Sequence, residues 1–138
     1  LTSDHGMVNA SEKIIIGHDN PLLEGVAVIG GEPRARHLYL SPDNDSVSAR
    51  SELASRWAEY LGEKATVLTR EEAITTKLFG DEVSADALDR MGEVIAIAQS
   101  GVVLLDPERA EKEAAMVGHH GGDSEIESEV GLLTTTLS

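Results

Sequence analysis

The sequence predicts an α+β fold in which an antiparallel sheet carries its helices on one face. Three observations predict it. Short apolar, β-branched runs alternate with breaker residues over residues 14–105. Two other stretches have apolar residues at helical spacing between capping residues. The predicted elements follow in the order β-β-β-α-β-α-β-β, which is typical of a layered α+β arrangement. We therefore expect one compact subdomain over residues 14–106, between flanking segments 1–13 and 107–138.

Three strands are predicted first. Residues 14–16 form a short apolar run that ends at the breakers of residues 17–21. Residues 26–31 are apolar and β-branched, and residues 36–41 alternate between apolar and polar side chains. A turn sequence, Gly-Gly-Glu-Pro, separates the last two runs. We expect those two strands to form an antiparallel pair.

Two helices are then predicted. The clearer one begins after the capping residues of 42–46, ends at Gly62, and repeats apolar residues at four-residue steps: Ala49, Leu53, Trp57 and Leu61. A short strand is expected at residues 65–68. Thr69 and Glu72 then have the spacing of a capping box, which predicts a second helix running to Gly80.

The rest of the predicted sheet comes from a hairpin. Residues 81–90 hold a short helical turn around Ala87 and Leu88. The apolar runs 93–99 and 102–105 flank Ser100-Gly101, a compact hairpin signal. From Pro107 the chain becomes charged, and a glycine- and histidine-rich stretch follows at residues 118–122.

Composition limits the classes of partner. The chain has 138 residues, 41% of them hydrophobic, which suffices for one domain with an aliphatic core. Its formal net charge of −14 repels phosphate backbones and anionic lipid, so neither a nucleic-acid polymer nor a membrane surface is an expected partner. The absence of cysteine excludes disulfides and fits a cytoplasmic location. No apolar run reaches the roughly 20 residues of a membrane span.

Two short stretches concentrate possible metal ligands, one at each end of the chain. The first is Ser3-Asp4-His5-Gly6 and the second is residues 118–122, which include His120. Without cysteine, a metal must be bound by His nitrogen and carboxylate oxygen, both of which zinc accepts. Asp4 and His5 would point to opposite faces of a regular strand, so we expect Gly6 to allow a turn. Each stretch alone is more typical of a capped turn or an exposed loop, whereas both together favour one shared site.

Thr2-Ser3-Asp4-His5-Gly6-Met7 resembles the motif of the alkaline phosphatase superfamily, and especially its type I phosphodiesterase/nucleotide pyrophosphatase branch. His120-Gly121 matches the later His-Gly of that family. The resemblance implies that Asp4 and His5 bind one of two zinc ions and that His120 binds the other. It also implies that residues 14–106 are a cap-like subdomain inserted into an α/β/α core, of which residues 1–13 and 107–138 are remnants.

The same resemblance implies a function. Such enzymes hydrolyse a nucleotide or another phosphoester through a Thr or Ser nucleophile, activated by two zinc ions, that lies upstream of the Ser-Asp-His-Gly motif. We therefore expect this chain to be the C-terminal part of such an enzyme, inactive alone, with the N-terminal part of the same protein as its partner. Uncovered sheet edges would favour self-association. The alternative hypothesis is a non-catalytic α+β interaction or lid module. The enzyme hypothesis alone predicts that Asp4 and His120 lie close together.

Several other polar or aromatic residues receive simpler interpretations. His119 is expected to be an exposed loop imidazole, the alternative being a hydrogen bond near the metal site. His18 is expected in a loop, and His37 at the surface or as a cross-strand partner. Arg34 and Arg36 are expected to pair with acidic neighbours rather than with a substrate phosphate, and Trp57 is expected in the core.

Overall fold

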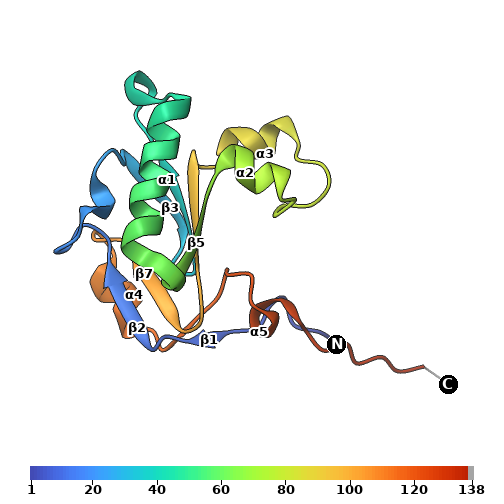
Figure 1. The fold of residues 1–138 in the computed structure, drawn as a ribbon. Helices are drawn as coiled ribbons and strands as arrows, with labels where there is room; N and C mark the ends of the chain where they lie inside the picture. The colour runs from blue at the N-terminus through green and yellow to red at the C-terminus, as the bar shows by residue number, and fades with distance from the viewer. Residues whose placement is uncertain (137–138) are drawn as a thin grey trace.

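The computed structural model describes residues 1–136, so the last two residues of the predicted segment 107–138 lie outside the described part. Its centre is a four-stranded antiparallel sheet of order β3-β4-β6-β5 (Figure 1). The strands are β3 (Val28–Glu32), β4 (Ala35–Tyr39), β5 (Ala65–Thr69) and β6 (Val94–Ala98). β3 and β4 are the predicted antiparallel pair, with Val28 opposite Tyr39.

One face of this sheet is covered by α1 (Val47–Leu61). The Ser46 side chain accepts a hydrogen bond from the Ala49 amide at the start of the helix, and Gly62, with φ of 54°, ends it. Buried side chains of α1 pack against alternate residues of β4 and β6 in a cluster that includes Leu53, Trp57, Leu61, Leu38, Val94 and Ala96. The prediction of this helix is confirmed.

The other face is also covered, which differs from the expectation of helices on one face. It carries α2 (Arg70–Thr75) and α3 (Ala85–Arg90), as Figure 1 shows. The predicted capping box is present at the start of α2. Ile95 and Ile97 of β6 pack there with Ala73 and Met91. The α+β class is confirmed, but every residue of β6 is buried. An apolar run without alternation is typical of a strand with both faces covered.

The predicted hairpin of residues 93–99 and 102–105 is wrong. The chain does turn there, since the Val102 amide donates to Gln99 O at 3.1 Å. β7 (Val102–Leu105) then leaves the central sheet and pairs parallel with β2 (Glu12–Ile15). On the other edge of β7, the Arg34 guanidinium donates to Val102 O at 2.7 Å and that of Arg36 to Leu104 O at 2.8 Å. On the same edge the Leu104 amide donates to Pro33 O at 2.8 Å. Two arginine side chains and one backbone carbonyl therefore take the place of a neighbouring strand.

A second two-stranded sheet joins the two ends of the chain. In it β1 (Val8–Asn9) pairs antiparallel with β8 (Gly118–His119). Short helices α4 (Ala110–Ala115) and α5 (Glu125–Ser128), which the sequence did not predict, flank β8. Three short 3-10 helices, η1 (Pro21–Leu23), η2 (Pro42–Asn44) and η3 (Gly62–Lys64), complete the described elements. The domain boundaries stay a prediction, and β2 runs across the one expected after residue 13.

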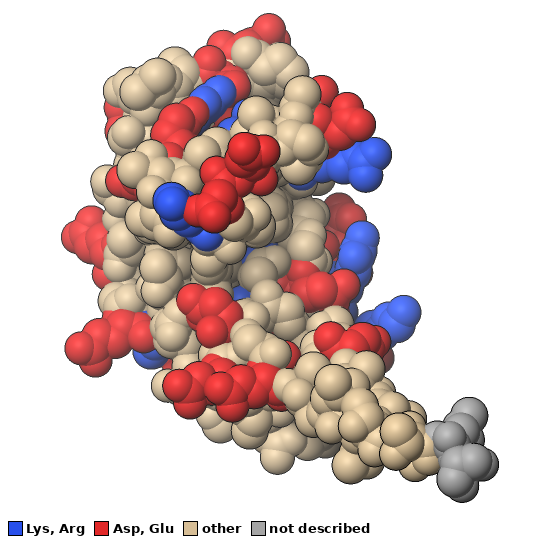
Figure 2. Space-filling model, turned by 90° about the vertical axis from the view of Figure 1, so that its right-hand side faces the viewer, with Lys and Arg blue, Asp and Glu red and all other residues tan. Residues whose placement is uncertain are grey.

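The surface reflects the charge of the chain. Figure 2 shows Asp and Glu side chains spread over one face, with fewer Lys and Arg side chains between them. None of the helices within residues 1–136 is long and apolar enough to cross a membrane.

Candidate functional site

The structure brings the two predicted metal-binding motifs together. β1 follows Ser3-Asp4-His5-Gly6, β8 leads into His120, and the two strands pair with Val8 opposite His119. The imidazole rings of His5 and His120 stack with their centroids 3.8 Å apart and their planes at 17°. The two motifs, far apart in the sequence, therefore meet at one place.

The hydrogen bonds of His5 fix its tautomer. Its Nδ1 lies 2.7 Å from the carbonyl oxygen of Gly6, which can only accept, so Nδ1 carries the proton. The other ring nitrogen, Nε2, lies 3.8 Å from Oδ2 of Asp4. The other oxygen of Asp4 accepts from the His5 amide at 3.1 Å. A ring nitrogen of His5 and a carboxylate oxygen of Asp4 therefore lie near each other.

These donors fit a zinc ion. Two ligands that each lie about 2.0–2.2 Å from one zinc can be at most about 4.4 Å apart, and the observed 3.8 Å between His5 Nε2 and Asp4 Oδ2 is within that limit. The Nδ1 hydrogen bond to a backbone carbonyl is the usual second-shell support of a histidine ligand. Within residues 1–136, no group of three or more His, Cys, Asp or Glu side chains is arranged to hold a metal. The ligand roles of Asp4, His5 and His120 stay a prediction.

Gly6 is required for a reason that the sequence did not reveal. We expected it to allow a turn, but its φ is not in the left-handed region. A Cβ at Gly6 would instead lie 1.7 Å from the backbone oxygen of Ile126. The Gly6 amide donates to Glu127 O at 2.9 Å. The first motif therefore rests directly on the backbone of α5.

The prediction for His119 is wrong, because its side chain is buried, with 3% of its surface exposed. It lies on β8, which pairs with β1, rather than in an open loop. Its Nε2 is a buried polar atom without a hydrogen-bond partner in the described part of the chain. Burial lowers the pKa of His119 and outweighs the neighbouring groups that raise it.

Arg34 and Arg36 pair with acidic residues, as predicted. Arg34 is fully buried and forms two hydrogen bonds to Glu127, from Nε to Oε1 at 3.1 Å and from Nη2 to Oε2 at 2.9 Å. Arg36 donates to Glu113 Oε2 at 2.6 Å. Sequence reasoning missed both glutamates, because nothing local distinguishes them from the many exposed acidic residues. The predictions for His18, an exposed loop residue, and for Trp57, a core residue, are confirmed.

The carboxylate of Glu127 has a strongly shifted pKa. Burial alone would raise it, but hydrogen bonds from Arg34, from the Ser124 hydroxyl and from the Gly122 amide lower the pKa from 4.5 to about 2. A carboxyl group whose pKa is lower in the folded state stabilises the fold above its unfolded pKa and loses that contribution as pH falls. The stabilisation by Glu127 is therefore complete above pH 4.5 and disappears towards pH 2.

We expect this shift to appear in acid denaturation. Between pH 5 and pH 2 the free energy of unfolding of the wild type should fall more steeply than that of Glu127→Gln, since the variant has no carboxyl group to protonate there. Urea titrations at several pH values measure both slopes. Glu125→Gln, at an exposed neighbouring position, serves as the control and should follow the wild type. Equal slopes for wild type and Glu127→Gln would contradict the assigned shift.

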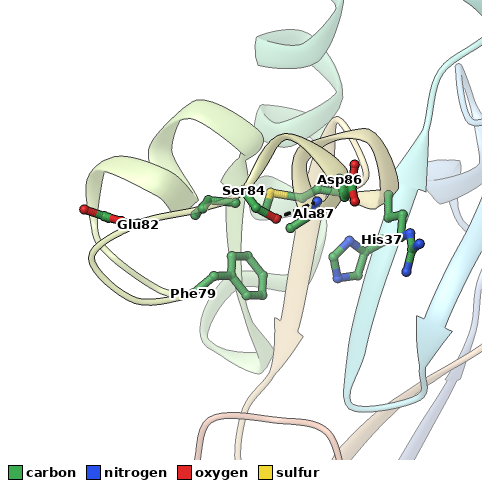
Figure 3. A pocket seen from close by; sticks show the side chains of 9 residues that line it. His37, Phe79, Glu82, Ser84, Asp86 and Ala87 are labelled. Atoms are coloured by element: carbon green, nitrogen blue, oxygen red, sulfur yellow. Dashed lines mark hydrogen bonds between the residues drawn. The ribbon is translucent and has the colours of Figure 1, made fainter.

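A hollow of about 590 Å³ lies between β4 and the segment of residues 79–91 (Figure 3). His37 and Phe79 point into it from opposite sides, whereas Glu82 points away. His37 Nδ1 accepts from the Gly92 amide at 3.1 Å, so its Nε2 carries the proton, and burial followed by the charge of Arg70 lowers the pKa of His37. An adjacent hollow of about 270 Å³ shares His37 and Phe79 and reaches Gly121 and Gly122, beside His120.

Comparisons with known proteins find similarity to one family and to solved structures. The model of the type I phosphodiesterase / nucleotide pyrophosphatase family matches residues 1–123. The solved structure of human ectonucleotide pyrophosphatase / phosphodiesterase 5 is similar over 91% of this chain and 30% of that one, with a TM-score of 0.62 and 17% sequence identity. For the murine protein of the same name the values are 94%, 31%, 0.64 and 19%. The chain thus spans about 30% of the length of these structures. A search of curated protein sequences gives no match.

Proposed function

Because the chain belongs to the type I phosphodiesterase / nucleotide pyrophosphatase family, we propose that it supplies the Asp-His and His-Gly parts of a zinc-dependent phosphoester hydrolase. In this proposal Asp4 and His5 bind one zinc ion and His120 binds the second. The Thr or Ser nucleophile lies in the rest of the protein, so this chain alone is inactive. The observation that carries the proposal is the contact between the two motifs: the His5 and His120 rings stack at 3.8 Å although they are far apart in the sequence.

Two zinc ions would supply charge neutralisation for the phosphoryl group and activation of an oxygen nucleophile. The residues of this chain orient the side-chain atoms that would bind the metal ions. The Gly6 carbonyl keeps the proton of His5 on Nδ1, which leaves Nε2 as a ligand atom near the Asp4 carboxylate. The exposed carboxylate of Asp4 adds negative charge to the pair, which favours a divalent cation. A nucleotide or another small phosphoester is the proposed substrate class.

The test is hydrolysis of bis(p-nitrophenyl) phosphate, with added zinc, by the protein that the whole reading frame encodes. Loss of a group that only supports a metal ligand typically costs about 10–100-fold in metal affinity or activity, so His120→Ala should cost at least about 100-fold. His18→Ala, which removes a histidine from an exposed loop, is the matched control and should keep full activity.

The outcomes separate the two hypotheses about the protein. Turnover that is lost in His120→Ala but kept in His18→Ala supports the proposed enzyme. Absence of turnover with every divalent metal and phosphoester tried, from a folded full-length protein, would overturn it. The non-catalytic interaction module would then be the better account of the fold.

A further inference from the structure

Glu127 is a heavily hydrogen-bonded side chain near the two motifs, to which no role at the candidate site has so far been assigned. Its carboxylate accepts four hydrogen bonds while almost fully buried, with 3% of its surface exposed. Arg34 donates two of them, and the Ser124 hydroxyl donates one to Oε2 at 2.5 Å. The fourth comes from the Gly122 amide to Oε1 at 2.9 Å. The side chain therefore holds the loop that follows His120.

The backbone of the same residue holds the other motif. The carbonyl oxygen of Glu127 accepts from the Gly6 amide at 2.9 Å. Both glycines are positions where a side chain would collide with this structure. A Cβ at Gly122 would lie 2.7 Å from Oε2 of Glu127, and one at Gly6 would lie 1.7 Å from Ile126 O. One residue thus touches the residue after His5 and the loop two residues after His120.

On this basis we propose that Glu127 is the positioning residue that sets His5 against His120. Its side chain fixes the His120 loop, its backbone fixes the Asp4-His5-Gly6 segment, and Arg34 anchors both to the central sheet. The importance of this role for catalysis rests on the proposed zinc-dependent function. The placement of His5 against His120 by Glu127 does not depend on zinc. Arg34 completes the arrangement, because its third nitrogen donates to Val102 O at 2.7 Å and so ties Glu127 to β7.

The chain contains a matched control for this residue. Glu113 is also a buried glutamate, 7% exposed, that pairs with a buried arginine, Arg36. Its Oε2 also accepts from the Asp106 amide at 3.0 Å. None of the hydrogen bonds described for Glu113 reaches either histidine motif, and its one described influence there is the effect of its charge on the pKa of His119, which it raises. Glu127→Gln and Glu113→Gln therefore make the same chemical change in similar surroundings and differ in what the carboxylate holds.

The experiment is NMR spectroscopy of the isotope-labelled chain, without metal. Two readouts do not touch the mutated side chain: the Gly6 amide, which bonds to the backbone of residue 127, and the ring C–H signals of His5 and His120, which report the stack. Glu127→Gln should shift the Gly6 amide and both ring signals, because the carboxamide places an NH2 group against the donors of Arg34 and Gly122. Glu113→Gln should leave these signals in place.

Unchanged Gly6 and ring signals in Glu127→Gln, or equal changes in Glu113→Gln, would overturn the proposal. Should Glu127→Gln fail to fold, Ser124→Ala removes one hydrogen bond to the same carboxylate, and it must shift the same signals less strongly in the same direction; no shift overturns the proposal too.

A zinc titration followed by the same signals separates this proposal from the proposed function. If zinc binds at these histidines, Glu127→Gln should weaken that binding by about 10–100-fold and Glu113→Gln should not, as expected for loss of a supporting residue. Equal zinc affinities of wild type and Glu127→Gln would contradict positioning of the ligands. A wild-type protein whose His5 and His120 signals do not respond to zinc would count against the metal site alone, and the metal-free spectra would still decide the role of Glu127.

Discussion

Arg36→Met is expected to lower the free energy of unfolding by about 3–5 kcal/mol, the usual cost of removing one partner of a buried ion pair. Arg36 is 1% exposed and donates to three groups: Glu113 Oε2 at 2.6 Å, Leu104 O at 2.8 Å and Gly31 O at 2.9 Å. Methionine fills a similar volume but donates nothing. The variant leaves the buried Glu113 carboxylate without its cation and the Leu104 and Gly31 carbonyl oxygens without this donor. Most of the cost arises because these groups remain buried, away from water, without the partner that offset their desolvation.

Urea denaturation measures this loss, and two further variants define its cause. Arg109→Met removes an exposed arginine whose Nε lies 3.8 Å from a carboxylate oxygen of Asp106, so it should cost no more than about 1 kcal/mol. Arg36→Met combined with Glu113→Leu removes both charges and should recover a large part of the loss. If the double variant is as unstable as Arg36→Met, an unpaired charge is not the reason for the effect.

Trp57→Ala is expected to cost a comparable 3–5 kcal/mol, for a different reason. Trp57 is a fully buried residue of α1, and its Nε1 donates to Leu22 O at 2.9 Å. Alanine leaves a cavity at the centre of an otherwise aliphatic core and also leaves the Leu22 carbonyl without its donor. Because domains of this size are stable by only about 5–15 kcal/mol, such a loss removes a large share of the total.

Trp57→Phe separates the two contributions, since it keeps most of the ring volume and loses only the hydrogen bond. It should cost clearly less than Trp57→Ala under the same urea titration. Tyr60→Ala, on an exposed part of the same helix, is the control and should change stability by no more than about 0.5 kcal/mol. Because alanine is a better helix former than tyrosine or tryptophan, neither variant loses stability through helix propensity. A Tyr60→Ala variant as unstable as Trp57→Ala would mean that the loss does not come from the buried position of Trp57.

Local patterns in the sequence predicted the local structure well. The four-residue spacing of α1, the capping box at Thr69 and Glu72, and the pairing of β3 with β4 all depend on residues that are close together in the chain. The presence of helices on both faces could also have been predicted. The uninterrupted apolar run of β6, from Val94 to Ala98, lacks the alternation of a strand with one face open to solvent.

The hairpin prediction was wrong because it depended on a local turn sequence, whereas the strand that pairs with β7 is distant in the sequence. Ser100-Gly101 does form a turn, but β7 finds a parallel partner in β2, about 90 residues earlier in the chain. The carbonyl oxygens of its other edge accept from the guanidinium groups of Arg34 and Arg36, and the Leu104 amide donates to Pro33 O. No periodicity in residues 93–105 indicates that β7 pairs with β2 or that the two arginines bind its other edge. A turn signal determines where the chain reverses, not which strand it pairs with.

The candidate site, too, was predicted where it depends on local sequence and missed where it depends on distant segments. Composition indicated the types of ligand residue, and the resemblance assigned them to Asp4, His5 and His120. The rings of the two histidines are in contact in the structure. Glu127 and the buried state of His119 depend on packing between segments more than 90 residues apart, so no local pattern could have indicated them.

The pairing of β2 with β7 and of β1 with β8 has a consequence for the order of folding. The four strands of the central sheet are all synthesised once the chain has reached Ala98. Among the described residues, the partner of β2 is complete only when Leu105 is made, and that of β1 only when His119 is made. Contacts of such high sequence separation form slowly, because a long loop must close first. During synthesis the central layer can fold while the two histidine motifs are still apart, so the site is assembled last.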